Sequence, residues 1–214
     1  MEFADLVRRR RMTRDFLADP IGDSVLERVF EAARRVPSAG NAQGCDLVVL
    51  NGPAETARYW DAALPASRRE TFRWKGLLVC PVLVTVWADP AAYVARYAEA
   101  DKQRTGLSAG SDAWSTPYWI VDASFAAMAL QYAAIDEGLG VLFFGMFDHA
   151  PSVAAALGVP AGHEPIGTLA IGWPDPSGSE SPGASAGRPR RPMFDDGKAP
   201  VSMNPLVHRG RYRG

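Results

Sequence analysis

The stretch of residues 119–134 constrains the fold of this chain most, because it is apolar on nearly every side. Phe125, Met128, Leu130 and many alanines leave no broad polar stripe that could face water. Such a pattern predicts a central buried helix and not a surface helix. Asp122 is the one early charge in the stretch. We interpret it as a first-turn acid that the helix dipole favours, in preference to a catalytic group.

Composition and charge bound the class of protein. The 214 residues are enough for one domain with a sizeable core, and the net charge of −1 gives no nucleic-acid signature. Cys45 and Cys80 lie in apolar runs, which predicts buried thiols in a reducing cytoplasm. The longest uncharged apolar run, residues 77–88, is too short to cross a bilayer, and no signal-peptide core follows Met1. We therefore expect a cytoplasmic protein with no nucleic-acid or membrane partner.

Strand and helix signals are interleaved along the chain. Apolar strand patterns cover residues 46–50, 77–87 and 163–172, and Asp89-Pro90 is a good start for a helix. Residues 105–117 have no periodicity, which predicts a mobile loop of the kind that often carries substrate contacts.

A turn rich in small residues and amides lies between a helical pattern and the first strand. This amide turn, residues 37–44, has the sequence Pro-Ser-Ala-Gly-Asn-Ala-Gln-Gly. Gly40 and Gly44 allow a tight turn and a close approach to a ligand. Asn41 and Gln43 offer donors and acceptors that suit the edge of a planar heterocycle. A plain helix-to-strand turn remains an equal alternative at this point.

Arginines gather at both ends of the chain. Residues 8–11 are four consecutive arginines and Arg14 follows, which suits either a solvated helix end or an anion site. Residues 174–187 are almost wholly Pro, Ser, Gly and Ala, which predicts a flexible linker. We therefore expect a domain over residues 1–173, a linker over 174–187 and a basic C-terminal tail over 188–214.

Several kinds of site have no sequence support. There is no Gly-x-Gly-x-x-Gly motif after a strand, no Walker loop and no cluster of metal ligands. We assign no catalytic side chain and no metal site, and we expect His149, His163 and His208 to play no part in proton transfer.

Four motifs in this order resemble the nitroreductase family of FMN-dependent oxidoreductases. They are residues 10–16, residues 37–43, the Gly138–Gly145 stretch and the Arg188–Pro192 run. The resemblance implies an α+β fold in which a mainly antiparallel central sheet is flanked by helices. It also implies an intertwined homodimer with two FMN sites at the interface, and a tail that helps to complete each site.

The resemblance also implies roles for individual residues. Arginines at the two ends would hold the FMN phosphate and ribityl chain, and the amide turn, largely from the partner subunit, would line the flavin ring. The backbone at Phe144 and Gly145 would approach flavin N5. The implied cofactor-binding residues are Arg10, Arg11, Arg14, Pro37, Ser38, Ala39, Asn41, Gln43, Phe144, Gly145, Arg188 and Arg190. Two positions depart from the family pattern: Met12 replaces a serine, and Gly44-Cys45 replaces a Pro-aromatic pair.

The predicted activity follows from the resemblance. It is NAD(P)H-dependent reduction of nitroaromatics, quinones or similar flat electrophiles through FMN, by a ping-pong mechanism. Because the flavin carries the redox chemistry, the protein needs only to bind and orient its substrates. Trp114 and Tyr118 are candidate substrate contacts, and the electron donor is NADH or NADPH. The alternatives are a flavin-dependent oxidase or dehydrogenase of a specialised metabolite, and a flavin-storing protein without turnover.

Overall fold

The computed structural model of the protein describes residues 1–178, 190–193 and 205–211. The chain divides into two compact units, Met1–Ser179 and Glu180–Gly214. All helices and strands of the described residues belong to the first unit. Within the second, Arg191 donates a hydrogen bond to the carbonyl oxygen of Pro205. Most of the predicted linker and much of the basic tail, including Arg188, lie outside the described residues.

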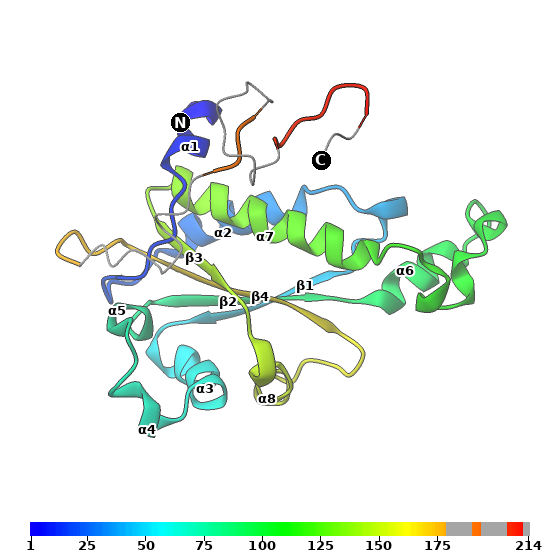
Figure 1. Ribbon diagram of the computed structural model, residues 1–214. Helices are drawn as coiled ribbons and strands as arrows, with labels where there is room; N and C mark the ends of the chain where they lie inside the picture. Colours follow the sequence, from blue (N-terminus) through cyan, green and yellow to red (C-terminus); the bar gives the residue numbers. More distant parts are fainter. Residues whose placement is uncertain (179–189, 194–204, 212–214) are drawn as a thin grey trace. The chain divides into compact units, whose positions relative to one another are not determined.

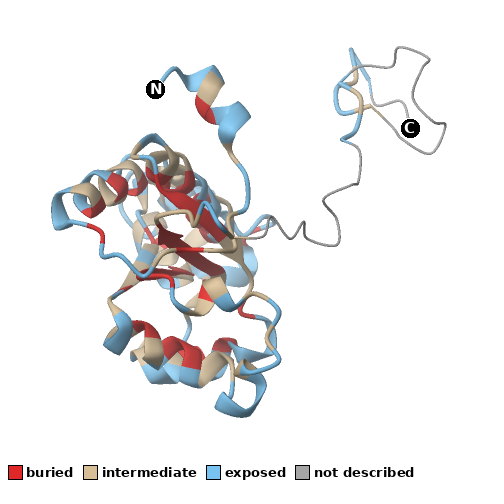
Figure 2. Cartoon of the chain, turned by 90° about the vertical axis from the view of Figure 1, so that its left-hand side faces the viewer, coloured by how far each residue is buried: buried red, intermediate tan, exposed pale blue. Residues whose placement is uncertain are grey.

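A four-stranded antiparallel sheet forms the centre of the first unit (Figure 1). The strand order is β1 (Cys45–Asn51), β2 (Val82–Ala88), β4 (Glu164–Gly172) and β3 (Gly140–Phe144). The two inner strands carry the mostly buried residues that appear as red ribbons in Figure 2. This arrangement confirms the predicted α+β fold with a mainly antiparallel sheet.

Helices cover both faces of the sheet, and each face has its own hydrophobic cluster. The helices α2 (Asp23–Arg34) and α7 (Tyr118–Asp136) lie on one face, and α3 (Pro53–Ala63) and α8 (Ala150–Leu157) lie on the other (Figure 1). Because successive strand residues point to opposite faces, Val82 and Val84 join the α7 cluster and Leu83 joins the other. The remaining α-helices are α1 (Phe3–Arg9), α4 (Ala66–Arg69), α5 (Lys75–Leu78) and α6 (Pro90–Tyr97).

Local sequence signals decide several element ends. The Asp89 side chain accepts a hydrogen bond from the Ala91 N–H at 2.9 Å, and Pro90 is the first residue of α6, as predicted. The prediction of one strand over residues 77–87 was wrong at its start, where the chain forms the end of α5. Pro81 cannot donate to a central ladder, and β2 begins just after it.

The apolar helix α7 is buried on one side only. Leu130 is fully buried against the sheet and α2, whereas Phe125 is 48% exposed and Met128 is 41% exposed. The prediction of an entirely buried helix was therefore wrong for a single chain, because one layer of neighbours covers only half of the helix surface. The uncovered outward face of α7 is apolar.

The segment predicted as an irregular loop contains short regular turns. Two 3-10 turns lie in it, η3 (Leu107–Ala109) and η4 (Ser111–Ala113), and η2 (Gln103–Thr105) ends at its first residue. Trp114 then packs inward with 9% of its surface exposed, and its Nε1 donates to the Leu107 carbonyl at 3.0 Å. The Trp114 ring therefore anchors the segment.

Candidate active site

The amide turn has an unusual backbone. Its centre is the 3-10 turn η1 (Ala39–Asn41), and Asn41 and Gln43 have φ values of +58° and +55°. Residues with a Cβ rarely adopt this left-handed conformation; asparagine tolerates it, whereas for glutamine it costs about 1–3 kcal/mol. Phe147, at φ +46°, is the third non-glycine residue with positive φ in the described chain. Two of the three instances thus lie in a segment that the sequence singled out for cofactor binding.

The glycines of the amide turn serve internal packing. A Cβ on Gly40 would lie 2.8 Å from the Tyr97 ring, and one on Gly44 would lie 2.7 Å from the Tyr93 ring. Both distances are too short for a side chain to fit without displacing α6. The two glycines therefore allow close packing of the turn on α6, and a close approach of a ligand to this backbone stays a prediction.

Three side chains fix the backbone of the amide turn. The Asp122 carboxylate accepts a hydrogen bond from the Ala39 N–H at 2.7 Å, and Arg96 Nε donates to the Gly40 carbonyl at 2.7 Å. Ser38 Oγ accepts from the Gln43 N–H at 2.9 Å. Asp122 is a buried residue that reaches the turn from α7, so its predicted role as a first-turn helix acid was wrong.

The two amide side chains of the turn face solvent. Asn41 and Gln43 are both exposed, and neither amide hydrogen-bonds to another residue that the structure describes. Pro37 is exposed beside them, while Ser38 and Ala39 are half-buried. A held backbone with available amides is the arrangement expected of a preorganised binding turn.

An aromatic cavity lies next to the turn. It has a volume of about 260 Å³ and is lined by Ala39, Tyr97, Leu107, Trp114, Ser115, Thr116 and Tyr118. The structure thus brings together both predicted substrate residues, Trp114 and Tyr118, and one predicted flavin-lining residue, Ala39. The Trp114 and Tyr97 rings meet edge to face at 4.6 Å, so the cavity wall is built from packed rings. Trp119, 5% exposed, packs in the core instead.

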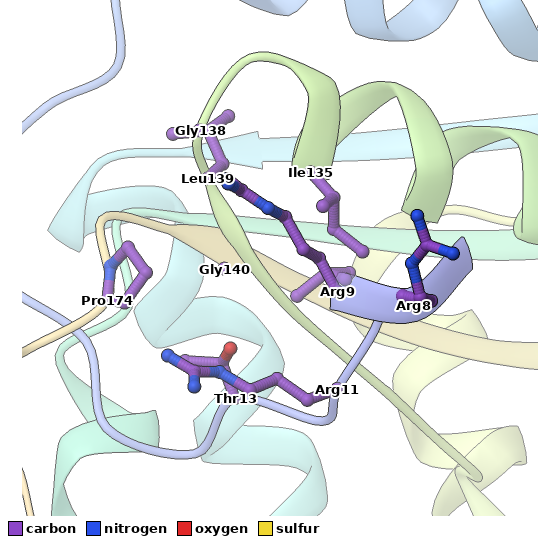
Figure 3. A pocket seen from close by; sticks show the side chains of 10 residues that line it. Arg8, Arg9, Arg11, Thr13, Ile135, Gly138, Leu139, Gly140 and Pro174 are labelled. Atoms are coloured by element: carbon purple, nitrogen blue, oxygen red, sulfur yellow. The ribbon is translucent and has the colours of Figure 1, made fainter. Parts of the chain in front are cut away.

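A second cavity, the arginine cavity, lies at the other end of α7 (Figure 3). It has a volume of about 470 Å³ and is lined by Arg8, Arg9, Arg11, Thr13, Ile135, Gly138, Leu139, Gly140, Val141 and Pro174. A hydrogen bond of 2.9 Å from the Thr13 N–H to the Val141 carbonyl holds the arginine segment against β3. In Figure 3 the Arg9 side chain extends toward Gly138 and Leu139.

The predicted arginines divide between different places. Arg11 lines the arginine cavity, but Arg10 and Arg14 do not. Arg14 instead lies over the Trp74 ring, 5.6 Å from its centroid. Arg190 is exposed and belongs to the second unit, and Arg188 lies outside the described residues. Arg8 and Arg9 were not selected from the sequence, because in an unbroken arginine run nothing shows which side chains share a face.

Phe144 and Gly145 lie at the end of β3. The Phe144 ring stacks on Trp60, with centroids 6.2 Å apart and planes 3° apart, inside the cluster of the α3 face. The neighbouring Phe147 is 84% exposed, and its ring atoms lie 3.1–3.3 Å from where a Cβ on Gly145 would be. The exposed ring beside the Gly145 backbone is thus Phe147, a residue that the sequence patterns did not indicate.

The two cavities lie far apart in one chain. Asp122, which holds the amide turn, and Ile135, which lines the arginine cavity, are 13 residues apart on α7. At 1.5 Å per helical residue this is about 20 Å along the helix axis. The two halves of the predicted cofactor site therefore do not meet within one chain.

Burial lowers the acidity of Tyr93 and of both cysteine thiols. It raises the pKa of Tyr93, and the Asp122 carboxylate that its hydroxyl contacts raises it further. Burial also raises the pKa of Cys45 to about 11 and of Cys80 to about 12. Neither thiol is therefore a nucleophile at neutral pH.

Some classes of site are missing from the part of the chain that the structure describes. No group of three or more His, Cys, Asp or Glu side chains is placed to hold a metal ion there. None of its helices is both long and apolar enough to span a membrane. His163 lies 3.0 Å from Asp46 at the start of β1 and lines neither cavity.

Comparisons with known proteins identify relatives in sequence and in fold. The chain is 30% identical over 178 residues to a 5,6-dimethylbenzimidazole synthase of Rhodospirillum rubrum, covering 77% of this chain and 78% of the other. It is 28% identical over 190 residues to an NADH dehydrogenase of Thermus thermophilus, with 81% and 87% covered. An FMN-dependent nitroreductase of Clostridium difficile has a similar fold, with a TM-score of 0.58 at 19% identity over 79% of this chain and 86% of that one.

The sequence profile of the nitroreductase family matches residues 7–173, which is most of the chain. The match spans the arginine segment, the amide turn, α7 and all four strands. On its sequence and its fold, the chain belongs to the nitroreductase family.

Proposed function

We propose that the protein is an FMN-dependent oxidoreductase that uses NAD(P)H to reduce flat electrophiles such as nitroaromatics and quinones. The observation that carries the proposal is the amide turn, whose strained backbone is clamped while the Asn41 and Gln43 amides stay available. Strained residues persist only where the surrounding structure holds them, and they cluster at active sites and ligand-binding segments. The names of two similar proteins, an NADH dehydrogenase and an FMN-dependent nitroreductase, support the donor and the cofactor.

The residues present fit FMN in two parts. The arginine cavity offers guanidinium groups, which bind phosphate oxygens in a planar fork, and Arg9 has no ion-pair partner among the described residues. The amide turn offers donors and acceptors for the polar edge of the ring. Bound FMN would supply hydride transfer between a nicotinamide and an acceptor. We also retain Arg10, Arg14, Arg188 and Arg190 as proposed phosphate ligands.

We propose that a second copy of the chain completes each site. The anchor of the amide turn, Asp122, and the arginine cavity are about 20 Å apart along α7, so we expect one flavin to take its ring contacts and its phosphate contacts from different chains. A two-fold axis near the middle of α7 would lay the C-terminal end of one α7 against the N-terminal end of its partner. The arginine cavity of each chain would then lie beside the partner's amide turn, giving two equivalent sites. The exposed apolar face of α7 would become buried in such a dimer.

The aromatic cavity is the proposed acceptor site. Its volume of about 260 Å³ is below the range of about 300–1,000 Å³ typical of drug-sized ligand sites, which favours a small ring system. Trp114, Tyr118 and Tyr97 offer ring faces for stacking on a planar acceptor. A site of this size holds one ring at a time, so donor and acceptor are expected to bind in turn.

The direct test is the purified protein itself. We expect a yellow protein whose released cofactor is FMN, bleached by NADH or NADPH and reoxidised by an added quinone or nitroaromatic. Double-reciprocal plots at several donor concentrations should be parallel. His149→Ala, His163→Ala and His208→Ala should each leave kcat within about tenfold, below the 10²–10⁴ typical of a general acid or base. FAD as cofactor, or a protein that ignores added FMN, would refute the proposal.

A second candidate is a flavin-dependent oxidase or dehydrogenase of a specialised metabolite. The chain is 30% identical to a protein named as a synthase, and this similarity supports the second candidate. Slow turnover with every quinone and nitroaromatic, despite rapid bleaching by NAD(P)H, would favour this candidate. A flavin-storing protein would show neither bleaching nor turnover. We infer a cytoplasmic location from the free thiols of Cys45 and Cys80.

A further inference from the structure

We propose that Asp122 is the positioning residue of the amide turn, holding it in its ligand-binding conformation through the Ala39 N–H. The identity of the ligand, FMN, rests on the proposed function. Asp122 would not touch the ligand itself. It acts through the backbone of the residues that do.

The geometry around Asp122 joins three distant parts of the chain. Its Oδ2 atom accepts one hydrogen bond from the Ala39 N–H and another from the Tyr93 hydroxyl, each at 2.7 Å. Asp122 is 5% exposed and Tyr93 is fully buried. One carboxylate oxygen thus fixes α7 to the amide turn and to α6.

A carboxylate in this place is costly for a purely structural contact. Removing an ionised group from water is unfavourable unless it is paired, and an apolar side chain often fills such a site with equal or greater stability. The two short hydrogen bonds offset part of the cost. One of these hydrogen bonds comes from the N–H of Ala39, the first residue of η1, so it stabilises the segment that contains the strained residues.

The strained residues explain why the turn needs an anchor. Gly40, Asn41 and Gln43 all have positive φ, and Gln43, which tolerates this region less well than glycine or asparagine, would leave it if the backbone were free. Asp122 holds the Ala39 N–H and Arg96 holds the Gly40 carbonyl, so the backbone is fixed immediately before Asn41. The direction of the two exposed amides is therefore set by contacts beneath the turn.

Tyr93 links the Asp122 carboxylate to the aromatic cavity, the proposed acceptor site. Burial and the neighbouring carboxylate raise the pKa of Tyr93, so its hydroxyl keeps the proton that it donates to Asp122. The Tyr93 ring also meets the Trp114 ring edge to face at 5.8 Å. The residue that orients Asp122 therefore supports a wall of the aromatic cavity.

The test uses the full-length protein with four substitutions. Asp122→Ala removes both hydrogen bonds, Asp122→Asn keeps an oxygen acceptor, and Tyr93→Phe removes only the orienting bond. Tyr59→Phe is the matched control, because it deletes another buried tyrosine hydroxyl, bonded to Thr168 at 3.1 Å in the cluster on the other face of the sheet. Two quantities are measured: the Kd for FMN by flavin fluorescence, and amide hydrogen exchange of residues 37–44 in the FMN-free protein.

We expect Asp122→Ala to raise the Kd for FMN at least about tenfold, Tyr93→Phe to raise it less, and Asp122→Asn to recover part of the loss. Exchange of residues 37–44 should accelerate in the same order. Tyr59→Phe should change neither quantity more than about twofold, even where it lowers Tm. Equal effects of Tyr93→Phe and Tyr59→Phe on exchange in the turn, or exchange in Asp122→Ala no faster than in the wild type, would overturn the inference. A wild-type protein that binds no FMN would refute the proposed function, whereas the exchange measurement would still decide the role of Asp122.

Discussion

Substitution of Phe125 tests the proposed homodimer most sharply. Full burial of a phenylalanine side chain contributes about 1.5–3 kcal/mol, and Phe125 is 48% exposed in the single chain. Covering the exposed half would thus contribute about 1 kcal/mol per chain. A two-fold interface contains the residue twice, so Phe125→Ala should cost about 2 kcal/mol and raise the dimer Kd about thirtyfold. Adding Met128→Ala, at a residue 41% exposed, should roughly double the loss in free energy.

The assay is sedimentation velocity over a dilution series, with Val79→Ala as the matched control. Val79 is 50% exposed and directly follows α5, whose Leu77 and Leu78 pack in the hydrophobic cluster of the α3 face. The control should dissociate at the same concentration as the wild type, and the α7 variants at higher concentrations. A wild-type protein that remains monomeric while holding FMN tightly would refute the reasoning. A Phe125→Ala protein with an unchanged dissociation midpoint would exclude α7 as the interface.

Three further predictions concern single sites. Phe147→Asn should raise the free energy of unfolding by about 1 kcal/mol, because asparagine tolerates positive φ and the lost ring is 84% exposed. Phe147→Val should lower the free energy of unfolding, and urea unfolding measures both changes. Arg11→Ala should weaken FMN binding about tenfold to a hundredfold by fluorescence titration, whereas Arg58→Ala, at an exposed arginine on α3, should leave it unchanged. Burial raises the pKa of Cys45 from 9.0 to about 11, so its alkylation by iodoacetamide at pH 8 should be about a hundredfold slower in the folded than in the unfolded protein. Alkylation of Cys80 should be slower still. Equal alkylation rates in the folded and unfolded protein would contradict this.

The same thiols predict a loss of stability in alkali. The folded-state pKa of Cys80 is raised from 9.0 to about 12, so its neutral form is favoured by folding. Its contribution is therefore complete below about pH 9 and declines as the pH rises toward 12. Cys80→Ala should reduce the pH dependence of Tm between pH 9 and 11, and an unchanged slope would refute the assignment.

The sequence predicted the features that depend on neighbouring residues. Asp89 and Pro90 start α6 because a cap and a fixed φ act within one helical turn. The fold class followed from an ordered set of motifs, and the family match confirms it. The extent of β2 was misjudged at Pro81, where a continuous apolar run hides the end of a short helix.

The features that depend on distant contacts were not predictable. Asp122 was read as a helix-dipole acid because nothing in its own helix shows a partner 83 residues away. The left-handed backbone of Asn41 and Phe147 leaves no mark in the sequence, since their residue types are ordinary in turns or cores. Arg9 could not be separated from Arg10, because which of them faces a cavity depends on where the chain leaves α1.

The placement of the two cavities at opposite ends of α7 has a genetic consequence. If each site takes its arginines from one chain and its amide turn from the other, an Arg11→Ala chain and an Asn41→Ala chain carry defects in different halves. Each variant alone would form two damaged sites. In a mixed dimer both lesions would fall in one site and leave the other wild type, and random pairing would restore about a quarter of all sites. Co-expression of the two variants would thus restore undamaged sites that neither variant forms alone, as intragenic complementation.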